Sequence, residues 1–229
     1  SYDTFTVEEG GIRFGLAAIK NIGRGFIQGV VREREASGDF AGFQDFCERM
    51  YGGDMNKRAL ENLIKAGAFD SFGVFRSRLA AVGEKLMDSI ANSRRQNLEG
   101  QMDFFGMSGG AKKSAELVLP NIPEYAEEER MRQEREVTGL YLSGHPMNAY
   151  REAARNAGAV HISSINEDFA QEGGPALYQD EQQIAVAGIV TAYRTRTTRN
   201  NSLMAYATIE DDTSSIELLC FSRTVERCG

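Results

Sequence analysis

Ser143 and His145 are residues that could do chemistry, because a serine and a histidine can act as a nucleophile and its general base. They lie in the run Leu140–Pro146, which lacks the G-x-S-x-G spacing of a nucleophile elbow and offers no third group to orient the histidine. Gly144 and Pro146 are typical of a turn. We therefore expect a connector here. A self-contained hydrolase using His145 would require turnover by this chain alone.

Carboxylates and thiols do not suggest a metal site. Glu210, Asp211 and Asp212 are consecutive, whereas two-metal chemistry needs carboxylates that project together from a scaffold, so we expect them to form a turn. The chain has three cysteines without C-x-x-C spacing and two histidines, which excludes a disulfide framework and a zinc site. We expect reduced thiols, with Cys47 and Cys220 in the core. The sequence thus predicts no catalytic residue and no metal ligand.

A turn containing glycines, Gly23-Arg24-Gly25, could bind phosphate through backbone amides at the start of a helix. Apolar residues keep helical spacing over 16–22 before the turn and over 26–31 after it, which predicts a helix, a tight turn and a second helix. The run Leu16–Gly25 resembles the first half of a helix-hairpin-helix motif. Asn21 stands where that family usually has the first glycine of its turn.

A second run, Met55–Asp70, also resembles such a hairpin, with Asn56 as a helix N-cap and Gly67 in the turn. The alternative is a plain helical bundle in which these glycines only end helices. Two hairpins in tandem favour weak binding of duplex DNA without sequence preference. The predicted duplex contacts are Lys20, Asn21, Gly23, Arg24, Gly25, Lys65 and Gly67.

Arginines and tyrosines near the C-terminus suggest a second nucleic-acid surface. Three arginines alternate with threonines, with no acid between them, beside two tyrosines in a region of period-two alternation. Phosphate contact combined with base stacking is how oligonucleotide-binding barrels hold single strands. A solvated edge strand protected by charge remains an equal alternative. The candidate single-strand contacts are Tyr193, Arg194, Arg196, Arg199 and Tyr206.

A pentapeptide between Gly100 and Gly106 carries two adjacent aromatic residues in a stretch rich in Gly, Ser and Lys. Such a segment can anchor in a partner's groove, with paired apolar side chains in a pocket and a glutamine at its rim. It resembles the sliding-clamp-binding motif of bacterial replication proteins. The alternative is a loop whose aromatics pack on adjacent helices. The candidate clamp-binding residues are Gln101, Met102, Asp103, Phe104 and Phe105.

These candidates require a multidomain chain that is α-helical first and β-stranded afterwards. We expect tandem helix-hairpin-helix elements over 1–92, with further apolar helical patterns around 43–50 and 79–90. Residues 93–123 lose this period and predict a flexible linker. A charged helix, the connector and a short helix follow over 124–182. Residues 183–229 predict a three-stranded meander that begins near Ile184, with a bulge or bend at Gly188, and belongs to an incomplete barrel.

Composition limits the classes of protein to consider. The net charge of −7 argues against coating nucleic acid by bulk electrostatics, although residues 10–36 are locally basic. The chain begins at Ser1 and shows no leader and no long apolar run, so we expect a cytoplasmic protein without a membrane partner, and a piece of a longer one.

The order of these features, ending in Leu142-Ser143-Gly144-His145-Pro146 and a barrel of the oligonucleotide-binding (OB) type, is similar to the C-terminal part of bacterial DNA polymerase III alpha subunits. The resemblance implies a DNA-directed DNA polymerase as the parent, with Mg²⁺ and the catalytic aspartates located upstream of this chain. It also implies duplex and single-stranded DNA, the beta sliding clamp and other replisome subunits as partners. A stand-alone DNA-binding adaptor that tethers a clamp is the alternative.

Overall fold

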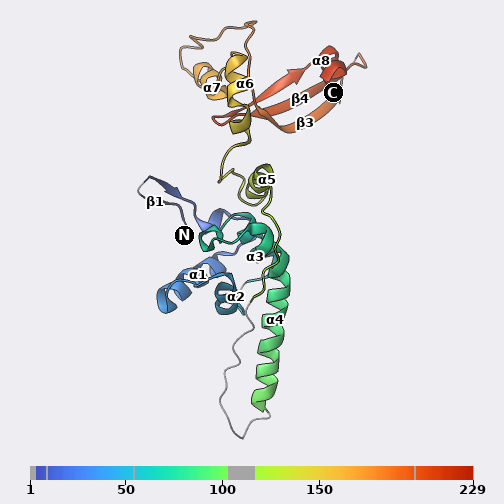
Figure 1. The fold of residues 1–229 in the computed structure, drawn as a ribbon. Helices are drawn as coiled ribbons and strands as arrows, with labels where there is room; N and C mark the ends of the chain where they lie inside the picture. The colour runs from blue at the N-terminus through green and yellow to red at the C-terminus, as the bar shows by residue number, and fades with distance from the viewer. Residues whose placement is uncertain (1–3, 9, 54, 103–116, 199, 229) are drawn as a thin grey trace. The chain divides into compact units, whose positions relative to one another are not determined.

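The computed structural model describes residues 4–8, 10–53, 55–102, 117–198 and 200–228, which belong to two compact units, residues 1–143 and 144–229 (Figure 1). The boundary lies inside the region 124–182 that we predicted as one piece. The charged helix packs on the first unit, because the side chain of Val137 at its end is 2% exposed and belongs to the core of that unit. The charged helix is therefore part of the helical unit, and the residues after the connector are part of the sheet unit.

The helical unit begins with a two-stranded hairpin that the sequence analysis missed. Its elements are β1 (Thr6–Glu8), β2 (Gly11–Arg13), the 3-10 helix η1 (Leu16–Ala18), α1 (Arg24–Ser37), α2 (Phe43–Met50), α3 (Lys57–Lys65), the 3-10 helix η2 (Asp70–Phe72), α4 (Arg76–Met102) and α5 (Glu127–Thr138). β1 and β2 pair antiparallel, with Val7 opposite Ile12.

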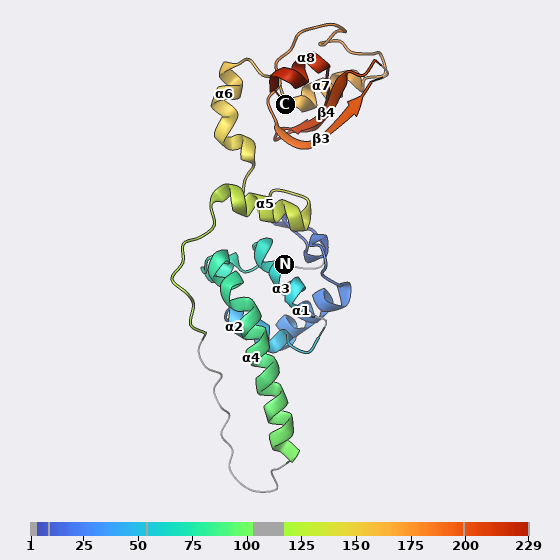
Figure 2. The ribbon, with the colours of Figure 1, turned by 90° about the vertical axis from the view of Figure 1, so that its right-hand side faces the viewer.

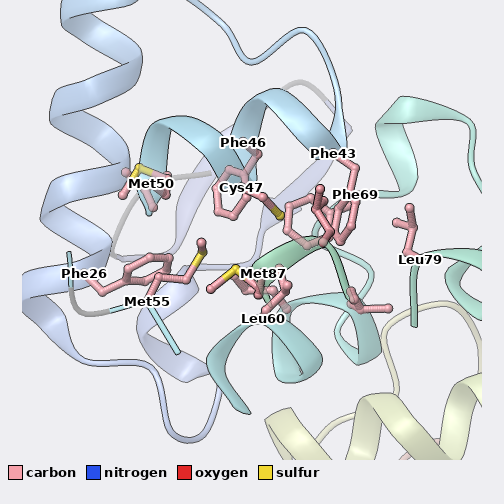
Figure 3. Packing of buried hydrophobic residues seen from close by; sticks show 14 of the residues in the cluster. Phe26, Phe43, Phe46, Cys47, Met50, Met55, Leu60, Phe69, Leu79 and Met87 are labelled. Atoms are coloured by element: carbon pink, nitrogen blue, oxygen red, sulfur yellow. The ribbon is translucent and has the colours of Figure 1, made fainter. Parts of the chain in front are cut away.

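The core of this unit is built from the apolar faces of α1 to α4 and the segment before η2. The ring of Phe69 lies 5.1 Å from that of Phe43 and 4.9 Å from that of Phe46, both in edge-to-face geometry (Figure 3). Edge-to-face aromatic pairs add to the free energy gained by burial. Cys47 is fully buried, and this burial raises the pKa of its thiol to about 12, so Cys47 is an unreactive core residue.

Most predicted helices of this unit are confirmed. The side chain of Asn56 caps α3, accepting a hydrogen bond of 2.9 Å from the amide of Ala59. The helix expected over 16–22 is wrong, because only η1 forms there. Leu16, Ile19 and Ile22 recur every three residues, a spacing that also suits a 3-10 turn followed by extended chain.

α4 continues to Met102, ten residues beyond the predicted end of the helix at residue 92, so the linker cannot begin at 93. Among the α4 residues up to 95, whose burial the structure describes, Ile90 is the last buried one, and both views show the second half of the helix extending past α1, α2 and α3 (Figures 1 and 2). Residues 92–102 are rich in good helix formers, and extending an existing helix costs little. The end of the apolar stripe marked the edge of the core and not the end of the helix.

The second unit combines short helices with the predicted meander, in the order β3-β4-β5 with antiparallel pairing. Its elements are the 3-10 helix η3 (Pro146–Tyr150), α6 (Arg151–Asn156), α7 (Ile162–Phe169), β3 (Ile189–Thr197), β4 (Leu203–Glu210), β5 (Ser215–Cys220) and α8 (Ser222–Cys228). α7 contacts β5, and α8 contacts β4. Helices followed by a three-stranded antiparallel sheet agree with the predicted fold class, including a partial OB-like region.

The first strand of the meander begins later than predicted. β3 starts at Ile189, and of the expected segment before it only Val186 pairs, through one parallel bridge with Val160. The irregularity lies between Val190 and Ala192 rather than at Gly188. A Cβ at Gly188 would lie 3.0 Å from the carbonyl oxygen of Glu210, so this glycine permits a close approach of two backbones.

No helix in the described part of the chain is both long and apolar enough to cross a membrane.

Candidate nucleic-acid interface

The turn before α1 contains a residue in the left-handed region of backbone conformation. Asn21 has φ of 60°, in the left-handed region that glycine usually occupies and that asparagine tolerates better than most residues. The side-chain amide of Asn62 in α3 donates a 2.6 Å hydrogen bond to the carbonyl of Lys20, the residue before Asn21. Asn21 therefore adopts the left-handed backbone conformation for which glycine is usually needed.

The N-terminus of α1 is exposed and lacks a cap from the described residues. Gly23 is the N-cap residue, and a Cβ built on it would meet nothing within 4 Å. Arg24 and Gly25 are also exposed, and no described residue accepts a hydrogen bond from their amides. The first turn carries no acidic residue. The positive end of the helix dipole therefore faces open space next to an arginine, which is a suitable environment for an anion.

The turn of the second hairpin is different. The amides of Gly67 and Ala68 donate to the carbonyls of Ile64 and Leu63, each at 3.0 Å, which ends α3 in the manner of a helix C-cap. Gly67 has φ of 74°, and a Cβ there would lie 2.8 Å from Cζ of Arg76. The expectation that the Gly67 amide faces phosphate is wrong, because this amide is used inside the protein.

The N-terminus of α4 already holds an anion from its own chain. The carboxylate of Glu124 accepts hydrogen bonds from the amide of Arg76 at 2.8 Å and from the amide of Ser77 at 3.1 Å. Burial by itself would raise the pKa of Glu124, but these amides and that of Tyr125 outweigh it and lower the pKa. Glu124 thus occupies the position where a helix N-terminus would bind phosphate.

The two predicted lysine contacts are both engaged with α5. The ammonium of Lys20 donates to the carbonyl of Glu136 at 2.7 Å, while its amide donates to the carbonyl of Val137 at 2.8 Å. The ammonium of Lys65 lies 3.2 Å from the carboxylate of Glu136 and 3.0 Å from that of Glu61. Sequence reasoning predicted these lysines as duplex contacts but did not foresee the carbonyl and the carboxylates that they bind within the protein.

Arg76 and Glu134 form a buried network that sequence reasoning missed. Arg76 is 4% exposed and its guanidinium binds Asp70 at 2.6 Å and Glu134 at 2.8 Å. Glu134 is fully buried and also accepts from the amides of Leu142 and Ser143, each at 2.8 Å. Burial would lower the pKa of Arg76, but the two carboxylates outweigh it and raise the pKa. The network joins α4, α5 and the connector.

One sequence signal could have revealed Arg76. A basic residue in the first turn of a helix is unfavourable beside the helix dipole, so an arginine there suggests a partner that compensates. Glu134 gave no comparable signal, because it stands among several glutamates of a charged helix and nothing in the sequence distinguishes it from them.

The C-terminal sheet separates the predicted single-strand residues between its two faces. Arg194 lies opposite Tyr206 across the β3–β4 pair, and its guanidinium sits 4.6 Å from the centre of that ring. The same guanidinium lies 2.9 Å from the carboxylate of Glu217. Arg196 shares this face by alternation. Tyr193 lies on the other face, opposite Ala207, whereas Arg199 lies outside the described residues.

The residues with apparent catalytic potential have structural roles. Nδ1 of His145 accepts from the amide of Met147 at 3.1 Å and caps η3. Asp211 forms the predicted turn, accepting from the amides of Thr213 and Ser214, each at 2.8 Å. Its other oxygen accepts from the amide of Ile162 at 2.8 Å and so caps α7. Nδ1 of His161 lies 3.9 Å from a carboxylate oxygen of Asp211 and 3.9 Å from one of Asp212. These three side chains are close enough together to bind one metal ion.

The predicted clamp-binding pentapeptide lies only partly in the described chain. The backbone of Gln101 and Met102 forms the last turn of α4. Asp103, Phe104 and Phe105 lie outside the described residues.

Residues 1–79 match the helix-hairpin-helix motif family. Curated proteins named DNA polymerase III subunit alpha are similar along almost the whole chain. The protein from Mycobacterium leprae is 32% identical over 95% of this chain, that from Saccharopolyspora erythraea 34% over 99%, and that from Deinococcus radiodurans 34% over 99%. The chain spans 18%, 19% and 17% of the length of these three relatives.

Proposed function

The chain belongs to the family of bacterial DNA polymerase III alpha subunits, of which it matches less than one fifth, and on this premise we propose that it is a non-catalytic, C-terminal part of a replicative DNA-directed DNA polymerase. Its role is to hold DNA and the sliding clamp, while the Mg²⁺-dependent chemistry belongs to other parts of the parent protein. The cytoplasm of a bacterium is the corresponding location.

The first hairpin is the proposed contact to duplex DNA. The observation that carries this proposal is the exposed N-terminus of α1, where the amides of Arg24 and Gly25 have no acceptor among the described residues. A backbone phosphate would accept from these amides and meet the side chain of Arg24. The helix N-terminus of the second hairpin is already occupied by Glu124, so this hairpin would contribute to the contact through the side chain of Lys65 and not through backbone amides.

Two substitutions at Arg24 test this contact. Proline is tolerated at the first position of a helix, and Gly23 has φ of −73° and ψ of 146°, which suits a residue before proline. Arg24→Ala removes the side chain only, whereas Arg24→Pro also removes the amide. Because a hydrogen bond to a charged group contributes about 1.5–3 kcal/mol, we expect Arg24→Pro to bind duplex about ten- to hundredfold more weakly than Arg24→Ala.

The measurement is fluorescence anisotropy of a labelled duplex at several salt concentrations, with circular dichroism as the check on folding. Salt should weaken binding by the wild-type chain. Equal affinities of the two folded variants would contradict the proposed amide contact, and binding that does not change with salt would contradict phosphate recognition altogether.

The outer face of the C-terminal sheet is the proposed contact to single-stranded DNA. Arg194, Arg196 and Tyr206 share this face, which supports phosphate contact beside a stacking platform. The ring of Tyr206 is covered by Arg194, so a base would need to displace that guanidinium or stack upon it. Tyr193, on the opposite face, is not part of this proposed surface.

The pentapeptide Gln101–Phe105 is the proposed attachment to the sliding clamp. Its first two residues form the end of α4, and its other three come directly after this helix in the sequence, an arrangement that supports docking in a partner's groove. Burial of each phenylalanine would contribute about 1.5–3 kcal/mol, and ordering the segment would offset part of this gain. We therefore expect an affinity on the order of micromolar.

Titration of the clamp against the Phe104→Ala, Phe105→Ala double variant tests the attachment. The double variant should lose binding, while Asp103→Ala, the matched control within the same peptide, should bind like the wild type. Equal binding by the double variant and the wild type would refute the assignment and favour aromatics that pack on the chain's own helices.

A further inference from the structure

Glu136 lies at the junction between α5 and the two hairpins, and the described contacts give it a role that the sequence did not suggest. The C-terminal turn of α5 meets both hairpins, since its residues contact Lys20 before the first turn and Lys65 at the end of α3. Asn62 links the two hairpins at the same place. The carboxylate of Glu136 is therefore held beside Lys65, one of the predicted duplex contacts.

The two lysines use different atoms of Glu136. The ammonium of Lys20 donates to the backbone carbonyl of Glu136, where it also neutralises the negative end of the α5 dipole. This contact does not depend on the glutamate side chain. The ammonium of Lys65 lies 3.2 Å and 3.4 Å from the two carboxylate oxygens, so that contact does depend on it.

The ion pair between Lys65 and Glu136 is accessible to solvent, so another anion can replace the carboxylate. The side chain of Glu136 is 61% exposed, whereas that of Lys65 is 23% exposed. An exposed carboxylate contributes little to the stability of its partner and can be displaced by another anion. A phosphate oxygen is a charged acceptor of the same kind, so it would compete with the carboxylate for the donors of the Lys65 ammonium.

We propose that Glu136 is an internal competitor of DNA phosphate for Lys65 and thereby weakens the binding of duplex DNA to the hairpin face. This inference rests on the proposed duplex contact of the first hairpin. When duplex binds, Lys65 exchanges the Glu136 carboxylate for a phosphate, and the displaced carboxylate turns to solvent. Glu61, one turn earlier on α3 and 3.0 Å from Lys65, remains as its second partner.

The test compares two charge-neutralising substitutions on the same helix in the complete 229-residue chain. Glu136→Gln removes the competitor. Glu128→Gln removes the same charge eight residues earlier, about 12 Å away along the helix axis, at an exposed position. Since an exposed ion pair contributes about 0.2–1 kcal/mol, we expect Glu136→Gln to bind a labelled duplex about two- to fivefold more tightly than Glu128→Gln. The slope of affinity against salt should steepen by about one phosphate contact.

Lys65 itself provides the second arm of the test. In a Lys65→Met background, Glu136→Gln should give no more gain than Glu128→Gln. With Lys65 present, equal duplex affinities of Glu136→Gln and Glu128→Gln would overturn the inference. A gain in affinity from Glu136→Gln that persists in the Lys65→Met background would overturn it too. Glu136→Asp, which keeps the charge but shortens the side chain, should also tighten binding if contact rather than the general field matters. A wild-type chain that shows no salt-sensitive duplex binding would instead contradict the proposed function.

Discussion

At the scale of residues, two glycines that look equivalent in the sequence have different physical roles. Gly23 lies at an open helix N-terminus with room for a side chain, whereas Gly67 has a positive φ and packs against Arg76 and Asp70. One glycine leaves backbone amides accessible, and the other allows a turn to close over a buried charge. Only the first can contribute directly to an anion site.

Alanine substitutions should reveal this difference. Gly67→Ala should lower the free energy of unfolding of the helical unit by about 1–3 kcal/mol, because the left-handed conformation and the close approach to Arg76 both oppose a Cβ. Gly23→Ala should cost under about 1 kcal/mol. Urea unfolding followed by circular dichroism provides the comparison. Equal losses would show that the two turns are equally strained.

Glu134 should be the most sensitive charged residue in the helical unit. Its carboxylate is fully buried and pairs with Arg76 and with the amides of Leu142 and Ser143. Glu134→Gln replaces one acceptor oxygen with a donor and leaves Arg76 partly unpaired, so we expect a loss of about 3–5 kcal/mol. Exposed Glu127→Gln on the same helix should change stability by less than about 0.5 kcal/mol. Urea unfolding of both variants tests this ranking, and a loss as small as that of the control would show that the network contributes little.

At the scale of elements, carboxylates from neighbouring segments fix the ends of helices. Glu124 from the segment before α5 caps α4, and Asp211 from the β4–β5 turn caps α7. These long-range caps attach each helix to the element that supplies the carboxylate. They also explain why α7 escaped sequence analysis, since its N-terminus carries no capping side chain of its own.

Asp211 should make the stability of the second unit dependent on acidity. Burial would raise the pKa of Asp211, but hydrogen bonds from Ile162, Thr213 and Ser214 outweigh it and lower the pKa. Because the pKa of Asp211 is lower in the folded state, its ionised carboxylate stabilises the fold fully at pH values above its unfolded-state pKa of about 4. This stabilisation is lost as the pH falls through the folded-state pKa. Asp211→Asn should therefore lose about 1–3 kcal/mol at pH 7 and show a weaker pH dependence below pH 4.

Thermal unfolding of the wild type and Asp211→Asn between pH 7 and pH 2.5 measures this effect on the second unit. Asp180→Asn, at an exposed position in the same unit, is the matched control. Identical pH profiles for the wild type and Asp211→Asn would contradict the role of Asp211 as a helix cap.

At the scale of the whole molecule, two compact units divide the chain between Ser143 and Gly144. The helical unit has the larger apolar core, with Leu60 among its most buried side chains (Figure 3). In the second unit, β4 supplies the buried positions Ala205, Ala207 and Ile209. Because each unit has its own core, each should have its own stability.

Leu60→Ala should reveal the separate stabilities. We expect it to cost the helical unit about 2–5 kcal/mol, since the side chain is 2% exposed and its removal leaves a cavity. Hydrogen exchange should then accelerate at amides of α2 and α3, while the β4 amides keep the rates of the wild type. Equal acceleration in both units would show that they unfold as one.

The sequence by itself determined most of the longer helices and the strands β4 and β5, because apolar periodicity and turn residues act locally, but it did not reveal the β1–β2 hairpin or α7. The helix around Leu60, its Asn56 cap and the strands β4 and β5 were all predictable, and so was the helical hairpin resemblance that the family match supports. Tertiary structure alone decided which charges are available to a ligand. Arg76, Lys65 and Glu124 are separated by many residues, and their pairings depend on how α4 and α5 pack. Local patterns contain no information about that packing, so the difference between the open hairpin and the self-capped one is visible only in the folded protein.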